Sequence, residues 1–223
     1  EMVRSDWSSD VCSSDLQRNA NDGISFLQIG EGALNEVSGI LIRQRELAIQ
    51  AANGTLGQTE RDTINNEFQD LTAEINRIAS VTQFNGTNIL LGSGTSTFQI
   101  GTDATSNDRV SIAAVDARAS SIGLGSGSGV ATVSTVSNAR SALASLDSAI
   151  SQVASLRATF GTVQNRLESA IRSLAVAQEN TSAAESRIRD VDFASETAEL
   201  TRNQVLQQAG ISVLAQANVS TQS

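Results

Sequence analysis

The stretch that decides the fold, residues 139–174, reads ARSALASLDSAISQVASLRATFGTVQNRLESAIRSL. Apolar side chains recur in it at intervals of seven, at Ala139, Leu146, Val153, Phe160, Leu167 and Leu174. A second set follows four residues behind members of the first, at Leu143, Ile150 and Ile171. This spacing is typical of an α-helix that buries one narrow face against partner helices. We therefore predict a long packed helix over residues 132–178.

Two polar residues, Arg157 and Gln164, take the positions at which the second set would continue. They either make polar contacts that fix the register of the helices or lie at the edge of the buried face. A helix over 132–178 would be about 70 Å long at ~1.5 Å per residue, so it needs partners along its length.

Two shorter helices are predicted as those partners. The first covers residues 21–52, with Asp22 as its N-cap and Gly54 in the left-handed conformation beyond its end. Its apolar face contains Leu27, Leu34, Leu41 and Ala48. The second begins at Thr59, and its apolar face contains Ile64, Phe68, Leu71, Ile75 and Ile78. The short link between the two helices predicts antiparallel packing.

The middle of the chain predicts a small β region. Asn85–Gly86 is a strong tight-turn signal, and residues 97–100 and 110–112 are predicted as the strands of a β-hairpin. Residues 123–129 (GLGSGSG) are typical of a flexible connector and do not match a dinucleotide-binding fingerprint. The predicted fold is mainly α, a long antiparallel helical bundle or coiled coil with a small β-hairpin region.

Composition excludes several function classes. The chain has 223 residues and a formal net charge of −9, which argues against nucleic acid as a partner. It contains no His, no Lys and no Tyr, and its single cysteine is Cys12. A histidine triad, a Walker lysine and a Cys/His zinc site are therefore excluded. We expect no enzyme activity, no cofactor, no metal and no membrane-spanning segment.

Residues 1–16 differ from the rest of the chain. They hold the only Trp and the only Cys and contain the near-repeat SSDVCSSD. The run WSSDVCSSDL resembles the translation of a sequencing-adapter oligonucleotide, so we hypothesise an assembly artefact, with a genuine disordered tail as the alternative. The predicted segments are a head (1–16), N-terminal core helices (17–91), a hairpin and linker (92–131), the long helix (132–178) and a C-terminal segment (179–223).

The C-terminal segment is predicted to be a separate, weakly apolar helix. Ser182 and Glu185 match a capping box, and Asp192 is expected to cap a last helix over residues 193–217. Its apolar side chains are interleaved with Gln, Thr and Ala, so alone in water it should be marginal. The residues of interest are Phe193, Leu200, Val205, Leu206, Ile211 and Leu214.

Six short segments, in order, resemble the conserved ends of bacterial flagellins. They are residues 18–25 (RNANDGIS), 31–36 (EGALNE), 45–48 (RELA), 84–87 (FNGT), 182–194 (SAAESRIRDVDFA) and 200–210 (LTRNQVLQQAG). The similarity covers residues 17–223 and implies a flagellin with a minimal variable middle. It implies export through the flagellar type III channel and polymerisation with other flagellin subunits into the extracellular flagellar filament for swimming motility.

The resemblance also implies partners and contact residues. The partners are an export chaperone that binds the C-terminal segment, the filament cap and junction proteins, and the host flagellin-sensing Toll-like receptor. Arg43, Leu47 and Glu67 match positions of a receptor-contact patch that is generally an axial subunit contact in the filament. The alternative for Arg43 and Glu67 is solvated helix surface, and for Leu47 it is the buried face. The apolar residues of 193–214 match the inner-core assembly and chaperone segment.

Two other functions remain open from the sequence: a hook–filament junction protein and a helical adhesin or binding module. The chain also departs from the family pattern. The N-terminal helix that pairs with the C-terminal helix is not matched, and the usual apolar ending is absent. We therefore expect the chain alone to stay monomeric, with residues after about 178 exchanging amide protons fast.

Overall fold

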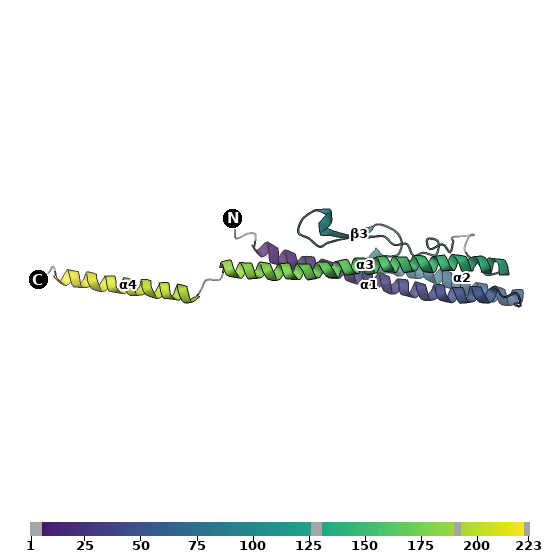
Figure 1. Cartoon of the computed structure of the whole chain (residues 1–223), viewed down its shortest axis with the longest axis horizontal. Helices are drawn as coiled ribbons and strands as arrows, with labels where there is room; N and C mark the ends of the chain where they lie inside the picture. Colours follow the sequence, from purple (N-terminus) through teal and green to yellow (C-terminus); the bar gives the residue numbers. More distant parts are fainter. Residues whose placement is uncertain (1–5, 126–130, 190–192, 221–223) are drawn as a thin grey trace. The chain divides into compact units, whose positions relative to one another are not determined.

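Long helices dominate the part of the chain that the computed structural model describes, which is residues 6–125, 131–189 and 193–220 (Figure 1). The helices are α1 (Asp6–Ala51), α2 (Gln58–Val81), α3 (Val136–Arg189) and α4 (Phe193–Ser220). Between α2 and α3 lie four short strands and the 3-10 helix η2 (Ser106–Asp108). The prediction of a mainly α fold with a long helix and a small β region is confirmed.

The chain divides into two units. One is Val11–Ala175, and the other consists of Glu1–Asp10 together with Val176–Ser223. The first unit holds the hydrophobic core, which contains most of the predicted apolar faces of all three packed helices. Every predicted member of the α3 set from Ala139 to Leu167 is buried, as are Leu27, Leu34, Leu41 and Ala48 of α1. Leu174, the last predicted member of the α3 set, is only half-buried, so the seven-residue repeat identifies the buried face of α3 as far as Leu167.

Ion pairs across the first unit give the direction of packing. Glu31 pairs with Arg157 at 3.6 Å, and Arg45 pairs with Asp147 at 2.8 Å. Positions later in α1 thus meet positions earlier in α3, as in antiparallel helices. Arg157 therefore makes a polar contact with a partner helix, one of the two alternatives for this residue. Gln164 is half-buried, and its Nε2 donates a hydrogen bond to Glu168 Oε1 of its own helix at 3.2 Å.

Helix α1 begins earlier than predicted. Asp22 lies inside it, so the prediction of an N-cap there is wrong. The reason is that the buried face continues upstream through Leu16 and Ala20, which are 4% and 0% exposed. The described residues 6–16 continue this helix; that they are an assembly artefact stays a hypothesis. Gly54 does not adopt a positive φ, so the predicted left-handed cap is also wrong.

Helix α3 extends further than predicted, to Arg189. Ser182 and Glu185 lie within it, so the predicted capping box does not start a helix. A capping box starts a helix only where the residues before it are not helical, and here the preceding residues are part of α3. The predicted cap Asp192 lies outside the described residues. The last helix, α4, is formed as predicted to within three residues of its end.

Both predicted β features are present. Strands β1 (Gln83–Phe84) and β2 (Thr87–Asn88) pair antiparallel around Asn85 and Gly86, whose φ values of 47° and 78° fit a two-residue hairpin turn. Strands β3 (Thr95–Gln99) and β4 (Arg109–Ala113) form the second hairpin, with Thr97 opposite Ser111. Edge-on ring contacts of Phe26 with Phe84 and Phe98, at 6.1 and 5.8 Å, pack both hairpins against α1.

The segment between β4 and α3 is held on α2 by amide side chains. Asn76 Oδ1 accepts a hydrogen bond from Ala119 N at 3.0 Å, and Asn65 Oδ1 accepts one from Val133 N at 2.9 Å. Gln69 Nε2 donates to Ala131 O at 2.8 Å. These bonds satisfy backbone groups of an irregular segment that would otherwise be costly to bury.

Among the described residues, two long polar side chains are buried besides Thr72 and Thr82. Gln44 is fully buried, and its Nε2 donates to Phe68 O at 3.0 Å and to Thr72 Oγ1 at 2.8 Å. Arg61 is 6% exposed, and its guanidinium donates to the carbonyl oxygens of Ala51, Asn53 and Leu56 at 3.1, 3.2 and 3.2 Å. Arg61 thus satisfies carbonyls at and beyond the end of α1, and fixes the turn into α2.

Candidate subunit-contact surfaces

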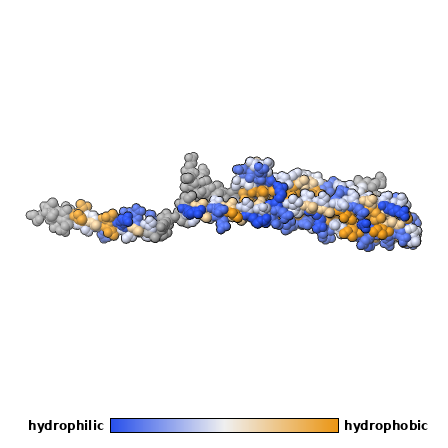
Figure 2. Space-filling model, viewed as in Figure 1, coloured by the Kyte–Doolittle hydropathy of each residue, from blue (hydrophilic) through white to orange (hydrophobic). Residues whose placement is uncertain are grey.

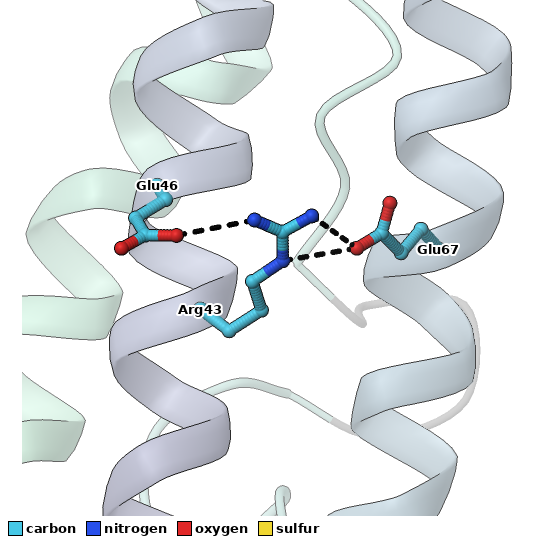
Figure 3. Close-up of polar contacts among 3 residues, drawn as sticks. All are labelled: Arg43, Glu46 and Glu67. Atoms are coloured by element: carbon cyan, nitrogen blue, oxygen red, sulfur yellow. Dashed lines mark hydrogen bonds and ion pairs between the residues drawn. The ribbon is translucent and has the colours of Figure 1, made fainter.

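A charged cluster bridges the exposed sides of α1 and α2 (Figure 3). Arg43 Nε and Nη2 both donate to Glu67 Oε1, at 3.0 and 2.7 Å, and Arg43 Nη1 donates to Glu46 Oε2 at 3.2 Å. Arg43 and Glu67 reach each other because they stand on adjacent antiparallel helices, whereas Glu46 is one turn along α1. The structure thus brings together two of the three predicted patch residues and adds Glu46.

The electrostatics of this cluster favour the charged form of Arg43. The hydrogen bonds that the Arg43 guanidinium donates to Glu67 and, to a smaller extent, to Glu46 raise its pKa above the ordinary value. The side chains remain about half exposed, at 51% for Arg43 and 47% for Glu67. Exposed ion pairs of this kind contribute only ~0–1 kcal/mol to stability. The cluster is therefore available for contacts with another molecule at little cost to the fold.

Leu47 is placed differently from the other two predicted residues. It is 2% exposed and belongs to the hydrophobic core. The structure therefore puts it in the buried face, the alternative that the sequence left open, and not on the surface beside Arg43. Its repeat position explains this, because Leu47 stands next to Ala48 in the apolar stripe of α1.

Two exposed isoleucines of α1 stand close in sequence to the charged cluster. They were not among the predicted site residues. Ile42 and Ile49 of α1 are 52% and 51% exposed, and they stand one residue before Arg43 and three after Glu46. Figure 2 shows apolar side chains gathered on the visible face near the end of α1. The signal that could have found them is their spacing of seven residues outside the buried stripe. The surface around Arg43 is therefore mixed, charged and apolar.

The apolar residues of α4 form the second surface. Every side chain that the structure describes in this helix, residues 195–215, is exposed. The predicted residues range from Leu200, 57% exposed, to Leu214, 69% exposed, with Val205, Leu206 and Ile211 between them. Val213, 67% exposed, was not among the predicted site residues. The Phe193 side chain lies outside the described residues.

Metal binding would need several His, Cys, Asp or Glu side chains close together. Among the residues described, no group of three or more His, Cys, Asp or Glu side chains is arranged to hold a metal ion. A search of the described helices finds none that is long and apolar enough to cross a membrane. The side chains of both surfaces are exposed and can contact another molecule.

Two protein-family models match the chain, one at each end. Residues 7–95 match the bacterial flagellin N-terminal helical region, and residues 143–223 match the bacterial flagellin C-terminal helical region. The chain belongs to the bacterial flagellins. This flagellin is a structural subunit of the flagellar filament, the location and function that its relatives' names describe.

Curated relatives agree over nearly the whole chain. Flagellin FlaB1 of Treponema pallidum (strain Nichols) is 40% identical, over 92% of this chain and 76% of the relative. The flagellin of Halalkalibacterium halodurans is 43% identical, over 92% of this chain and 74% of the relative. The predicted family membership is therefore confirmed.

Solved structures show the same fold. The crystal structure of Bacillus cereus flagellin has a TM-score of 0.62 and 34% identity, covering 70% of this chain and 88% of that chain. A hook-associated protein of Vibrio parahaemolyticus has a TM-score of 0.64 but only 16% identity, so it shows the fold alone. The filament subunit is favoured over the junction protein that the sequence left open.

Proposed function

We propose that copies of this flagellin contact one another in the filament through the apolar side chains of α4 and through the surface around Arg43. The observation that carries this proposal is the exposure of α4. Its large apolar side chains from Leu200 to Leu214 are all more than half exposed.

The energetics favour a covered α4. Fully burying a Val, Leu or Ile side chain contributes about 1.5–3 kcal/mol. With Leu200, Val205, Leu206, Ile211, Val213 and Leu214 available, a neighbouring subunit that covered α4 would gain a large driving force. A helix with this composition is marginal in isolation, so assembly would also stabilise the helix.

The surface around Arg43 suits a weaker, orienting contact. Its guanidinium and the carboxylates of Glu46 and Glu67 already satisfy one another, and Ile42 and Ile49 lie beside them. Charged groups at an interface set register and partner choice more than affinity. Arg43 and Glu67 would therefore align neighbouring subunits, and the same exposed groups are available to a host flagellin-sensing Toll-like receptor.

The remaining partners follow from family membership. A flagellin is expected to leave the cell by flagellar type III export, to be held by a chaperone on its C-terminal segment before export, and to meet cap and junction proteins at the filament ends. The exposed α4 supports the chaperone contact, because an uncovered apolar helix needs protection before assembly.

A catalytic role is not part of this proposal. The chain has no His, Lys or Tyr, and the carboxylates of the Arg43 cluster lie on an open surface and not in a cleft. The function proposed is structural.

A pair of variants tests the role of α4. In the organism that carries the gene, Leu206→Glu places a charge within the apolar residues of α4, and Gln204→Glu places the same charge two residues away at a polar position. We expect Leu206→Glu cells to lack filaments in electron micrographs while Gln204→Glu cells retain them. Normal filaments containing the Leu206→Glu protein would contradict the proposal.

A further inference from the structure

Two Asn–Gly pairs occur in the sequence, Asn53–Gly54 and Asn85–Gly86. In such a pair the glycine nitrogen can attack the asparagine side-chain carbonyl, because glycine has no side chain to obstruct the approach. The two pairs lie in different surroundings. Asn53 follows the end of α1 in the exposed loop to α2, whereas Asn85 closes the β1–β2 hairpin.

We propose that Asn53–Gly54 is a site of spontaneous deamidation in the folded protein, faster than Asn85–Gly86. The Gly54 nitrogen bonds to Asn53 Cγ and loses its proton to the departing amide, which leaves as ammonia, so a cyclic imide forms. Water then adds to one of the two imide carbonyls and opens the ring. The products carry aspartate or isoaspartate at position 53, and no oxidant or reductant is needed.

The attacking nitrogen is activated by bonds to the Asn53 main-chain carbonyl. That oxygen accepts a hydrogen bond from Arg61 Nη2 at 3.2 Å and from Leu56 N at 3.4 Å. Loss of the Gly54 amide proton places negative charge on this peptide unit, including its oxygen. A guanidinium and an N–H directed at that oxygen favour the charged form, so they make the proton easier to lose.

The attacked carbonyl is activated as well. Asn53 Oδ1 accepts a hydrogen bond from Thr55 N at 3.2 Å. As the Gly54 nitrogen adds to Cγ, negative charge develops on Oδ1, and a donor already directed at it stabilises that charge. The same bond ties the side chain along the Gly54 peptide, which favours the geometry of attack. Asn53 and Gly54 are both exposed, so water reaches the imide.

Asn85 has neither form of activation. Across the described part of the chain, no hydrogen bond reaches the Asn85 side chain. Its φ of 47° and that of Gly86, 78°, are fixed between the paired strands, with Phe84 opposite Thr87. Ring closure requires rotation about the asparagine backbone, which the hairpin pairing resists. Asn85–Gly86 therefore serves as an internal reference for the deamidation rate at Asn53–Gly54.

The products would change the turn between α1 and α2. Either product places a new carboxylate close to the Arg61 guanidinium, which already contacts the Asn53 carbonyl. Isoaspartate also adds one carbon to the main chain at Asn53, whose N–H donates to Gln50 O at 3.1 Å. A subunit altered in this way would differ in its α1–α2 turn from a newly made one.

The test is incubation of the purified chain in ¹⁸O-water at neutral pH, followed by tryptic digestion at mildly acidic pH and mass spectrometry. Residues 46–61 and 78–109 form separate tryptic peptides, so the two sites are followed independently. The ¹⁸O label marks conversion during incubation and not during digestion. A parallel incubation in urea gives the rates of the unfolded chain, and Asn53→Gln identifies the isoaspartate signal of this site.

We expect the folded protein to convert Asn53 at least about tenfold faster than Asn85, a modest share of the ~10²–10³ that one donor to a developing oxyanion supplies in an enzyme. In urea the two sites should react at similar rates. The proposal is overturned if Asn85 reacts as fast as Asn53 in the folded protein, or if folding does not accelerate Asn53.

Discussion

Arg61 Nε lies 3.1 Å from the carbonyl oxygen of Ala51, the last residue of α1, and donates a hydrogen bond to it. This buried guanidinium has carbonyl partners at Asn53 and Leu56 as well. We predict that Arg61→Leu lowers the free energy of unfolding by about 2–4 kcal/mol, since hydrogen bonds to charged groups are strong and the carbonyls lose their donor.

The control for that variant is Arg77→Leu. Arg77 pairs with Glu74 of its own helix at 2.6 Å, but 59% of its side chain is exposed. Its removal should change the unfolding free energy by no more than about 0.5 kcal/mol. Urea unfolding followed by circular dichroism compares the two, and equal losses would contradict a special role for Arg61.

Glycines on opposite sides of α1 should respond oppositely to alanine. A Cβ at Gly30 would lie 2.6 Å from the Phe160 ring and 2.9 Å from Ile89, whereas a Cβ at Gly39 would meet nothing within 4 Å. We predict that Gly30→Ala destabilises the chain by about 1–3 kcal/mol through overpacking. Gly39→Ala should stabilise it by up to about 1 kcal/mol through helix propensity. Thermal unfolding of both variants measures the difference, and a stabilised Gly30→Ala would refute the close α1–α3 packing.

The buried amide of Gln44 lacks one partner. Its Nε2 has two acceptors, but no hydrogen bond reaches Oε1 within the described residues. An unsatisfied buried polar atom costs about 1–3 kcal/mol, so an apolar side chain of similar length should not weaken the fold. We predict an unfolding free energy for Gln44→Met that is unchanged or raised by about 1 kcal/mol. A large loss in urea unfolding would show that the Gln44 hydrogen bonds outweigh this cost.

Most of the packing could be predicted from sequence because it depends on repeat spacing. The intervals of seven in α1 and α3 locate the buried side chains correctly from Leu27 to Leu167. Helix ends were harder to predict. The buried face continues past the local cap motif at Asp22, and Ser182 lies among residues that remain helical on both sides of it. Arg61 and Gln44 were missed as buried groups, although Arg61 precedes Ile64 and Phe68 at helical spacing.

Acid should weaken the segment after β4 through Asp116. Hydrogen bonds from Arg118, and a smaller contribution from Ser121, hold the pKa of the Asp116 carboxyl well below its ordinary value of 3.8. A lowered folded-state pKa contributes stability that is complete above the ordinary value and is lost as pH falls below it. Asp116→Asn should therefore be less stable than the parent at pH 7, and the difference should shrink in acid.

Urea unfolding from pH 7 down to pH 2 measures that dependence. Asp103→Asn, in the exposed loop of the second hairpin, is the matched control for removing one carboxylate. A difference between parent and Asp116→Asn that stays constant across this range would refute the role of the Asp116–Arg118 pair, whose atoms lie 2.6 Å apart.

As with the fold, part of each candidate surface could be predicted from the sequence and part could not. The α4 residues were found through the resemblance to the flagellin C-terminal segment, and the large apolar side chains described there are exposed. Leu47 was placed in the patch only by the family resemblance, whereas its position beside Ala48 in the apolar stripe favoured the buried face, where it lies. Ile42 and Ile49 stand seven residues apart outside the buried stripe, and the structure leaves both about half exposed.

Neighbouring subunits should cover α4 in a filament made from this protein. Cryo-electron microscopy of filaments sheared from the cells that carry the gene would show whether they do. We expect density for this chain in the filament, with Leu206 and Leu214, 63% and 69% exposed in the single chain, buried between subunits. A filament lacking this chain, or one in which these two side chains face solvent, would contradict it.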